Sequence, residues 1–251
     1  MTLVTGEPDE STISSGSASV LVASDLSKSF GSFQAVAGVG FELRAGEALG
    51  LVGPNGSGKT TVINVVSGVY KTDGGSVLLD GRDVTGMPSH RLCRLGLNRT
   101  FQIPRPLADL TVAENLALVN VRQRSESLLG VDPLSFVGLD SYSGRQAGTL
   151  TSAEQKLLDL ARALAANPVV LLVDELGAGL SPQELDHVAE LLRALKQAGI
   201  ALVVVEHLMG FLELVVDRVI VLNAGTPIFR GTLREAIAEP AVIEIFLGGH
   251  P

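Results

Sequence analysis

The stretch Gly53–Thr61 constrains the fold of this chain more than any other part of its sequence. It reads Gly-Pro-Asn-Gly-Ser-Gly-Lys-Thr-Thr and lies between the apolar runs Ala48–Val52 and Val62–Val66. This order predicts a strand, a glycine-rich loop and a helix, with the spacing of a phosphate-binding loop. Glycines let the backbone curl so that several N–H donors point at one spot. The alternative is a turn that matches by accident, but the flanking strand and helix argue against it.

Each part of this loop has a physical role at a phosphate. The helix that begins near Lys59 directs the positive end of its dipole toward an anion. Lys59 supplies a positive charge to the β- and γ-phosphates, and the Thr60 hydroxyl is placed to hold Mg²⁺, which prefers oxygen ligands. We therefore predict a nucleotide site. Its loop residues are Gly53, Pro54, Asn55, Gly56, Ser57, Gly58, Lys59, Thr60 and Thr61.

The composition favours a globular protein and argues against several function classes. The 251 residues are 46% hydrophobic, and the net charge of −8 disfavours nucleic-acid binding, which needs a basic surface. The single cysteine, Cys93, excludes an internal disulfide. Met1–Glu10 lacks a signal pattern, and no apolar run reaches the ~20 residues of a bilayer-spanning helix. We expect a soluble chain that can dock on a membrane protein, with a disordered tail at 1–18 and one domain at 19–251.

Two buried strands are predicted to end in polar side chains. Val169–Val173 runs into Asp174-Glu175, and Ala201–Val205 runs into Glu206-His207. Continuous apolar runs are typical of parallel strands buried on both faces, and ligands bind at the carboxyl ends of such strands. We predict that Asp174 lies on the Mg²⁺ side, that Glu175 is a base for water, and that His207 is catalytic. The alternatives are a solvated strand end and a structural histidine.

Periodicity and capping patterns place the remaining elements. Further strands are expected at Val20–Val22, through Val36, Val39 and Phe41, at Ser76–Leu79, and in a closing hairpin of Arg218–Asn223 and Thr226–Arg230. Helices are expected at Pro88–Arg94, Thr111–Val119, from the capping box Thr151–Glu154 through Leu164, and at Pro182–Ala198, Leu233–Ala238 and Val242–Leu247. Residues 122–148 predict loops and short helices.

Two features have competing interpretations. Phe30, before a glycine, is either a core residue or a platform on which adenine stacks. A locally basic segment follows Pro88, and we expect its charges to form a solvated face. Its arginines are Arg91, Arg94, Arg99 and Arg105.

From about Val20 to its end, the chain resembles the ATP-binding subunit of an ABC transporter. The resemblance rests on the order of the phosphate loop, Gln102, the helix opening at Thr151, Asp174-Glu175 and His207. Within the family it resembles the ATPases of branched-chain amino-acid uptake systems, in Gly81–Gly86, Arg99–Gln102, Leu110–Asn115 and Val205–His207. The implied fold is α/β: a P-loop NTPase (RecA-like) parallel-sheet core, an antiparallel β subdomain, and a helical signature subdomain at about 88–165.

The resemblance implies roles for individual residues. Phe30 lies where the family stacks adenine, and Val36 is a further implied ATP contact. Thr60, Gln102 and Asp174 are the implied Mg²⁺ ligands, with Gln102 also sensing the membrane subunit. Glu175 matches the general base, His207 matches the histidine that contacts the γ-phosphate, and Lys59 completes the implied catalytic set. The segment Ala178–Ser181 matches a loop that crosses the dimer interface, and the signature residues Thr151, Ser152, Ala153 and Glu154 act in trans on the partner's nucleotide.

Two departures from the family pattern stand out. The signature is usually Leu-Ser-Gly-Gly-Gln, but here Ala153 replaces a glycine and Glu154 adds a negative charge, while Thr151 keeps a hydroxyl. Leu176 stands where a proline usually follows the acidic pair. We hypothesise that this chain hydrolyses ATP at its own site and that its signature serves the partner's site less well. Such asymmetry suits a heterodimer of two different ATPases.

The implied function is to power an importer, most closely one for branched-chain amino acids, with ATP and Mg²⁺ as cofactors. The implied partners are membrane permease subunits, a second ATP-binding subunit in a homo- or heterodimer and, indirectly, a substrate-binding protein, at the cytoplasmic face of the cell membrane; no nucleic acid is expected. Alternatives are urea or amide uptake, lipopolysaccharide export, or a regulatory subunit with weak hydrolysis. ABC proteins of DNA repair or translation carry two cassettes or a long coiled-coil insertion, which this sequence lacks.

Overall fold

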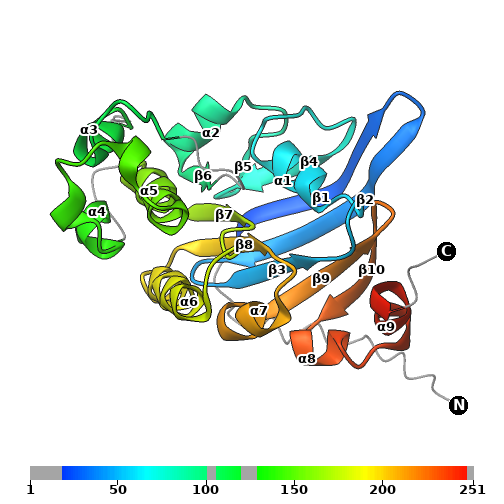
Figure 1. Cartoon of the computed structure of the whole chain (residues 1–251). Helices are drawn as coiled ribbons and strands as arrows, with labels where there is room; N and C mark the ends of the chain where they lie inside the picture. Colours follow the sequence, from blue (N-terminus) through cyan, green and yellow to red (C-terminus); the bar gives the residue numbers. More distant parts are fainter. Residues whose placement is uncertain (1–18, 101–105, 120–128, 248–251) are drawn as a thin grey trace, which may run out of the picture.

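A six-stranded sheet lies at the centre of the part of the chain that the computed structural model describes, residues 19–100, 106–119 and 129–247 (Figure 1). Its strand order is β10-β9-β3-β8-β7-β6, parallel except for β10, which forms an antiparallel hairpin with β9. The bounds are β3 Ala48–Val52, β6 Leu97–Arg99, β7 Val170–Asp174, β8 Ala201–Val205, β9 Arg218–Asn223 and β10 Thr226–Gly231.

The central strands are apolar throughout because both of their faces are covered. Along β8, Leu202 and Val204 pack into one hydrophobic cluster, while Val203 and Val205 pack into the other. Alternate side chains of a strand point to opposite faces, so a strand covered on both sides has no polar position. This confirms the parallel core expected from the unbroken apolar runs.

Helices and a second sheet supply the two covers. Helix α1 (Lys59–Val66) and a four-stranded antiparallel sheet, ordered β2-β1-β4-β5, pack on one face. The other face is covered by α5 (Ser152–Ala165), α6 (Pro182–Gln197) and α7 (Met209–Val215). The second sheet consists of β1 Ser19–Phe30, β2 Phe33–Arg44, β4 Gly74–Leu79 and β5 Arg82–Asp83.

Short helices complete the described chain. Helices α3 and α4 gather beside α5, at the left of Figure 1, and α8 and α9 lie at the other end of the molecule. Their bounds are α2 Ser89–Leu95, α3 Val112–Ala117, α4 Pro133–Phe136, α8 Leu233–Ala236 and α9 Pro240–Leu247, with 3-10 turns at Asp140–Tyr142 and Ala147–Thr149. Among the described residues, no helix combines the length and apolar character needed to cross a membrane.

Most predicted elements are present, with shifted ends. Both predicted capping boxes form, at Thr111 and at Thr151, because each hydroxyl accepts the N–H of a glutamate three residues on. Pro88 is the N-cap of α2 and not its first residue. Sequence patterns missed β5, β6 and α7 and predicted only part of β1, whose register shifts break its alternation. The predicted disordered tail at 1–18 lies outside the described residues, and the division into subdomains stays a prediction.

Candidate functional site at the strand ends

The loop after β3 is a backbone cradle that requires glycine. Gly53, Gly56 and Gly58 all have positive φ, at 149°, 78° and 101°. A Cβ on Gly53 would lie 2.2 Å from the carbonyl oxygen of Leu222, and one on Gly58 would lie 2.5 Å from that of Ala35. The neighbouring strands therefore pack against one side of the loop, and a ligand can bind at the other side.

The N-terminus of α1 opens into this loop without a side-chain cap. Its N-cap is Gly58, in the left-handed conformation, with no capping hydrogen bond and no acidic residue in the first turn. The first amides of a helix have no acceptor within the helix, so they are available to an anion. The predicted order of strand, glycine loop and helix is confirmed, with Thr60 exposed and Thr61 partly exposed on the first turn.

Lys59 lies inside the cradle. It is 8% exposed, and its Nζ donates to the carbonyl oxygens of Gly53 at 2.7 Å and Pro54 at 2.9 Å. Burial lowers the pKa of Lys59, while the charges of Glu175 and Asp174 oppose that shift. The ammonium group therefore lies within electrostatic reach of both acids at the end of β7.

Asp174 ends β7 as a buried carboxylate, 1% exposed. Its Oδ2 accepts a hydrogen bond from Arg99 at 3.1 Å, and its Oδ1 has no hydrogen-bond partner in the described part of the chain. Burial raises the pKa of Asp174, against the opposing charges of Arg99 and Lys59. An open, buried carboxylate oxygen beside a phosphate loop fits a magnesium ligand.

Arg99 corrects the expectation of a solvated basic face. Arg91 and Arg94 are exposed as expected, but the Arg99 side chain is only 12% exposed and bonds Asp174. The reason is that β6 pairs with β7, which brings Arg99 next to the end of that strand. Arg105 and Gln102, the latter a predicted magnesium ligand, lie outside the described residues.

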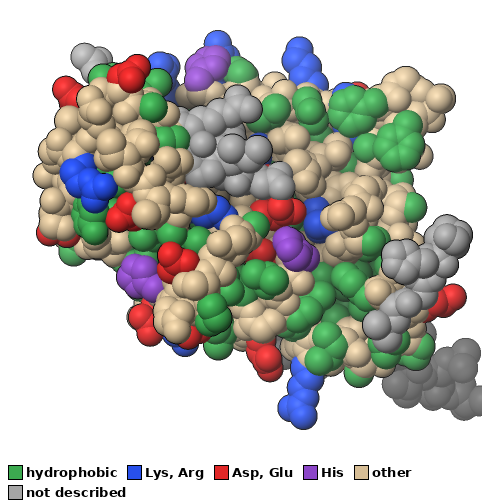
Figure 2. Space-filling model, viewed as in Figure 1, with side chains coloured by type: hydrophobic (Ala, Val, Ile, Leu, Met, Phe, Trp, Pro, Cys, Tyr) green, Lys and Arg blue, Asp and Glu red, His purple; other side chains and the backbone are tan. Residues whose placement is uncertain are grey.

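Glu175 begins the loop after β7 with a left-handed backbone, at φ 49°. Its N–H donates to the carbonyl oxygen of Val205 at 2.9 Å, which ties it to the end of the neighbouring strand β8. His207 follows that strand and is exposed. The predicted acids and the histidine thus emerge from adjacent strands, and Figure 2 shows acidic, basic and histidine side chains gathered near the middle of this face.

Two buried charges that sequence reasoning left without a role hold the loop 175–178. Lys156 of α5 donates to the carbonyl oxygens of Leu176 at 2.9 Å and Ala178 at 2.5 Å. Glu206 accepts the N–H of Gly177 at 2.6 Å. Burial lowers the pKa of Lys156 and raises that of Glu206. In the sequence, only Glu206 indicated such a contact, because it is a charged residue directly after a strand predicted to be buried.

Leu176, which departs from the family pattern, is 2% exposed and packs in the hydrophobic core. Its side chain therefore anchors the loop 175–178 from below. A leucine at this position does not disturb the loop, because the apolar cluster under β7 and β8 accommodates it.

The two predicted ATP contacts near the β1–β2 hairpin differ. Phe30 is 45% exposed, so it is not a core residue, and its ring meets Tyr70 edge-on at 5.3 Å between ring centroids. An exposed, braced ring fits the platform interpretation. Val36 is fully buried in the core, so its side chain supports the site from behind and does not present itself to a nucleotide, which corrects its assignment as a contact.

The predicted signature residues open α5. The Thr151 hydroxyl accepts the N–H of Glu154 at 3.2 Å, and the Glu154 carboxylate accepts the N–H of Thr151 at 2.7 Å. The pKa of Glu154 is lowered, chiefly by this hydrogen bond from the Thr151 backbone. The helix N-terminus therefore carries its own negative charge, beside the exposed Ser152 and the partly buried Ala153.

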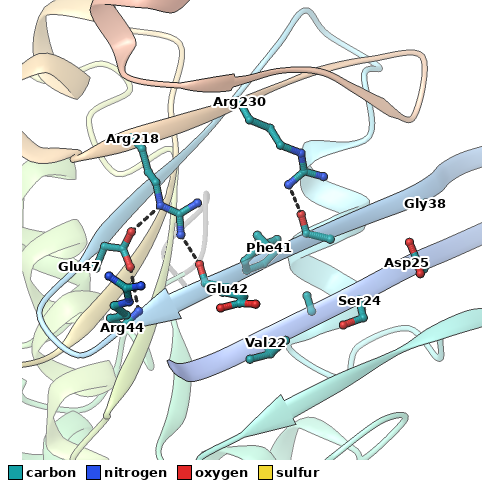
Figure 3. Close-up of a pocket in the computed structure, with 12 residues that line it drawn as sticks. Val22, Ser24, Asp25, Gly38, Phe41, Glu42, Arg44, Glu47, Arg218 and Arg230 are labelled. Carbon is teal, nitrogen blue, oxygen red and sulfur yellow. Dashed lines mark hydrogen bonds and ion pairs between the residues drawn. The ribbon is translucent and has the colours of Figure 1, made fainter. Parts of the chain in front are cut away.

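A cavity of about 640 Å³ lies away from this site, between the antiparallel sheet and the β9–β10 hairpin (Figure 3). Arg218 donates to the Glu47 carboxylate and to the Glu42 backbone, and Arg230 donates to the carbonyl oxygen of Gly40. Because these guanidinium groups are used in joining the two sheets, we assign the cavity no part in nucleotide binding.

Comparisons with known proteins match this geometry. Residues 36–178 match the family model described as ABC transporter. The chain is 32% identical over 249 residues to the high-affinity branched-chain amino acid transport ATP-binding protein BraF of Pseudomonas aeruginosa, covering 91% of this chain and 98% of that protein. It is 34% identical to the LivG protein of the same description from Escherichia coli, with the same shares covered.

A solved structure has the same fold. The crystal structure of the ADP conformation of MJ1267, an ATP-binding cassette of an ABC transporter, aligns with a TM-score of 0.83 and 30% identity. The alignment covers 92% of this chain and 100% of that one.

Proposed function

The chain belongs to the ABC transporter family, as an ATP-hydrolysing subunit, and from this premise we propose that it powers the uptake of branched-chain amino acids. The observation that supports branched-chain amino acids as the cargo is the sequence identity of 32% to BraF and of 34% to LivG over nearly the whole chain. Two separate relatives described by the same cargo favour it over urea, amides or lipopolysaccharide.

At the proposed site, ATP and water react to give ADP and phosphate. The loop amides, the α1 N-terminus and Lys59 bind the phosphates, and they stabilise the charge that spreads over the transferred group. Glu175 orients the attacking water and accepts its proton, and His207 contacts the γ-phosphate. Phe30 stacks on the adenine.

Magnesium fits this site because Asp174 has a buried, open oxygen and Thr60 an exposed hydroxyl. These two residues, with Gln102, are the proposed ligands. When bound, the ion would neutralise part of the phosphate charge and stabilise the negative charge that develops on the leaving oxygen.

Coupling to transport needs partners. We propose that the chain pairs with a second ATP-binding subunit, binds membrane permeases at the cytoplasmic face, and responds indirectly to a substrate-binding protein. ATP closes the pair and hydrolysis reopens it.

Reconstitution of the transport system tests which solute it carries. The chain is co-expressed with candidate permeases and a second ATPase subunit, and phosphate release is measured with the associated binding protein. Stimulation by leucine, isoleucine or valine, and not by urea or amides, supports the proposal. Stimulation by urea alone would contradict it, and ATP binding with no hydrolysis in any assembly would favour the regulatory alternative.

A further inference from the structure

Arg99 joins three elements next to the proposed magnesium site. From the end of β6 its guanidinium donates to Asp174 Oδ2 at 3.1 Å, to Asn64 Oδ1 at 2.6 Å and to Ser67 Oγ at 3.3 Å. Asn64 lies within α1 and Ser67 is its C-cap, so Arg99 links the helix behind the phosphate loop to the end of β7.

These contacts leave one oxygen of Asp174 open. Arg99 engages Oδ2, while the Asp174 N–H donates to the buried Thr100 hydroxyl at 3.3 Å. Oδ1 is buried and has no hydrogen-bond partner among the described residues. A carboxylate held at one oxygen can turn only a little, so its second oxygen keeps a defined direction.

We propose that Arg99 is a positioning residue for magnesium: it holds Asp174 so that the open oxygen meets the ion of Mg-ATP, and it fixes α1 relative to β7. The inference rests on the proposed function, because Thr60 on α1 and Asp174 on β7 are two of the ligands proposed there. Arg99 hydrogen-bonds both elements, and its bond to Asp174 is the route by which it acts on the ion.

Arginine suits this role better than lysine does. The planar fork of a guanidinium donates in several fixed directions at once, and here it spans an amide and a hydroxyl from α1 and a carboxylate from β7. An ammonium group at this place could pair with Asp174, but it could not hold all three partners in one plane. We therefore expect Arg99→Lys to retain part of the effect and Arg99→Met to lose it.

Nucleotide binding with and without magnesium tests the inference. The affinity of the full-length chain for a fluorescent ATP analogue is measured in EDTA and in Mg²⁺, for the wild type, Arg99→Met, Arg99→Lys and the control Arg193→Met. Arg193 is an exposed arginine of α6. We expect Arg99→Met to keep its affinity in EDTA and to lose about tenfold of the gain that Mg²⁺ brings, as residues that orient a metal ligand do. The control keeps both values.

A double substitution separates positioning from general damage. If Arg99 acts through Asp174, adding Arg99→Met to Asp174→Asn lowers the magnesium gain no further. An equal loss of affinity in EDTA and in Mg²⁺ means that Arg99 only supports the fold, and it overturns the inference, as does an unchanged magnesium gain. If the wild type itself gains nothing from Mg²⁺, the proposed metal site fails and the inference fails with it.

Discussion

At the scale of single residues, the carboxylate of Glu175 is the proposed base for the attacking water. Its backbone is fixed by the bond from its N–H to Val205, at a φ of 49°. Glu175→Gln keeps the size of the side chain and removes its basicity. We expect nucleotide affinity to stay and hydrolysis to fall by about 100-fold or more, the share that a general base supplies. Phosphate release and nucleotide binding measure the two effects, and near-normal turnover in this variant contradicts the assignment of the base.

A second prediction concerns the glycine loop after β3 and the stability of the folded chain. Gly53→Ala places a methyl group against the Leu222 carbonyl, at a φ of 149°, which is strained for any side chain. We expect a loss of about 2 kcal/mol or more and weak nucleotide binding. Gly144→Ala is the matched control, because nothing lies within 4 Å of its Cβ position. Equal melting temperatures for the two variants would show that the loop can relax around the methyl group.

The role of a residue could be predicted from the sequence where that role depends on residues close to it along the chain. The role of Lys59 follows from the nine residues around it, because loop and helix form in sequence order. Arg99 looked like its exposed neighbours, since the partner that buries it, Asp174, is 75 residues away. The same holds for Val36, which the β2 pairing buries in the core.

At the scale of elements, α5 and the loop 175–178 are joined through Lys156. Lys156 is 5% exposed, and its ammonium group donates to the carbonyl oxygens of Leu176 and Ala178. Lys156→Met leaves these oxygens without this donor, and we expect a loss of about 1–3 kcal/mol and slower hydrolysis at unchanged nucleotide affinity. The exposed Lys71 supplies the control, Lys71→Met. If the two variants have the same unfolding curve, Lys156 does not stabilise the loop.

Glu206, which accepts the N–H of Gly177 in that loop, predicts a dependence of stability on pH. Burial raises its pKa, so the folded chain holds this proton more tightly than the unfolded chain does. The resulting stability is present below the ordinary pKa of a glutamate and is lost as the pH rises through the folded value. Glu206→Gln stays neutral, so its melting temperature relative to wild type should be higher at pH 7.5 than at pH 4.5. A difference that does not change with pH contradicts this sign.

At the scale of the whole molecule, the sequence predicted the sheet core and the meeting of the phosphate loop with the strand ends. The reason is that parallel strands buried on both faces are continuously apolar, and the order of the elements fixes which ends face the ligand. It could not predict β6 or the edges of the helical region, because short strands carry no periodicity of their own. The contacts of Lys156 and Arg99 depend on that three-dimensional packing.

The last prediction concerns the assembly of two subunits. In the proposed dimer, the N-terminus of α5 faces the partner's nucleotide, but here Glu154 returns its carboxylate to Thr151 and places a negative charge at that helix end. Such a charge offsets the attraction of the helix end for an incoming phosphate, which is about 0.3–1 kcal/mol, or a factor of about two to five in binding or rate. Glutamine also forms a capping box, so Glu154→Gln removes the charge while keeping the cap.

A heterodimer isolates this effect when its copy of this chain carries Glu175→Gln, because turnover then comes only from the partner's site. We expect Glu154→Gln and Ala153→Gly, added to that copy, each to raise turnover by about two- to fivefold, since the first removes repulsion and the second opens the backbone to phosphate. Glu190→Gln, which removes an exposed negative charge from α6, controls for net charge. Unchanged turnover in both signature variants would mean that the departures are harmless and that the two sites of the dimer are served equally.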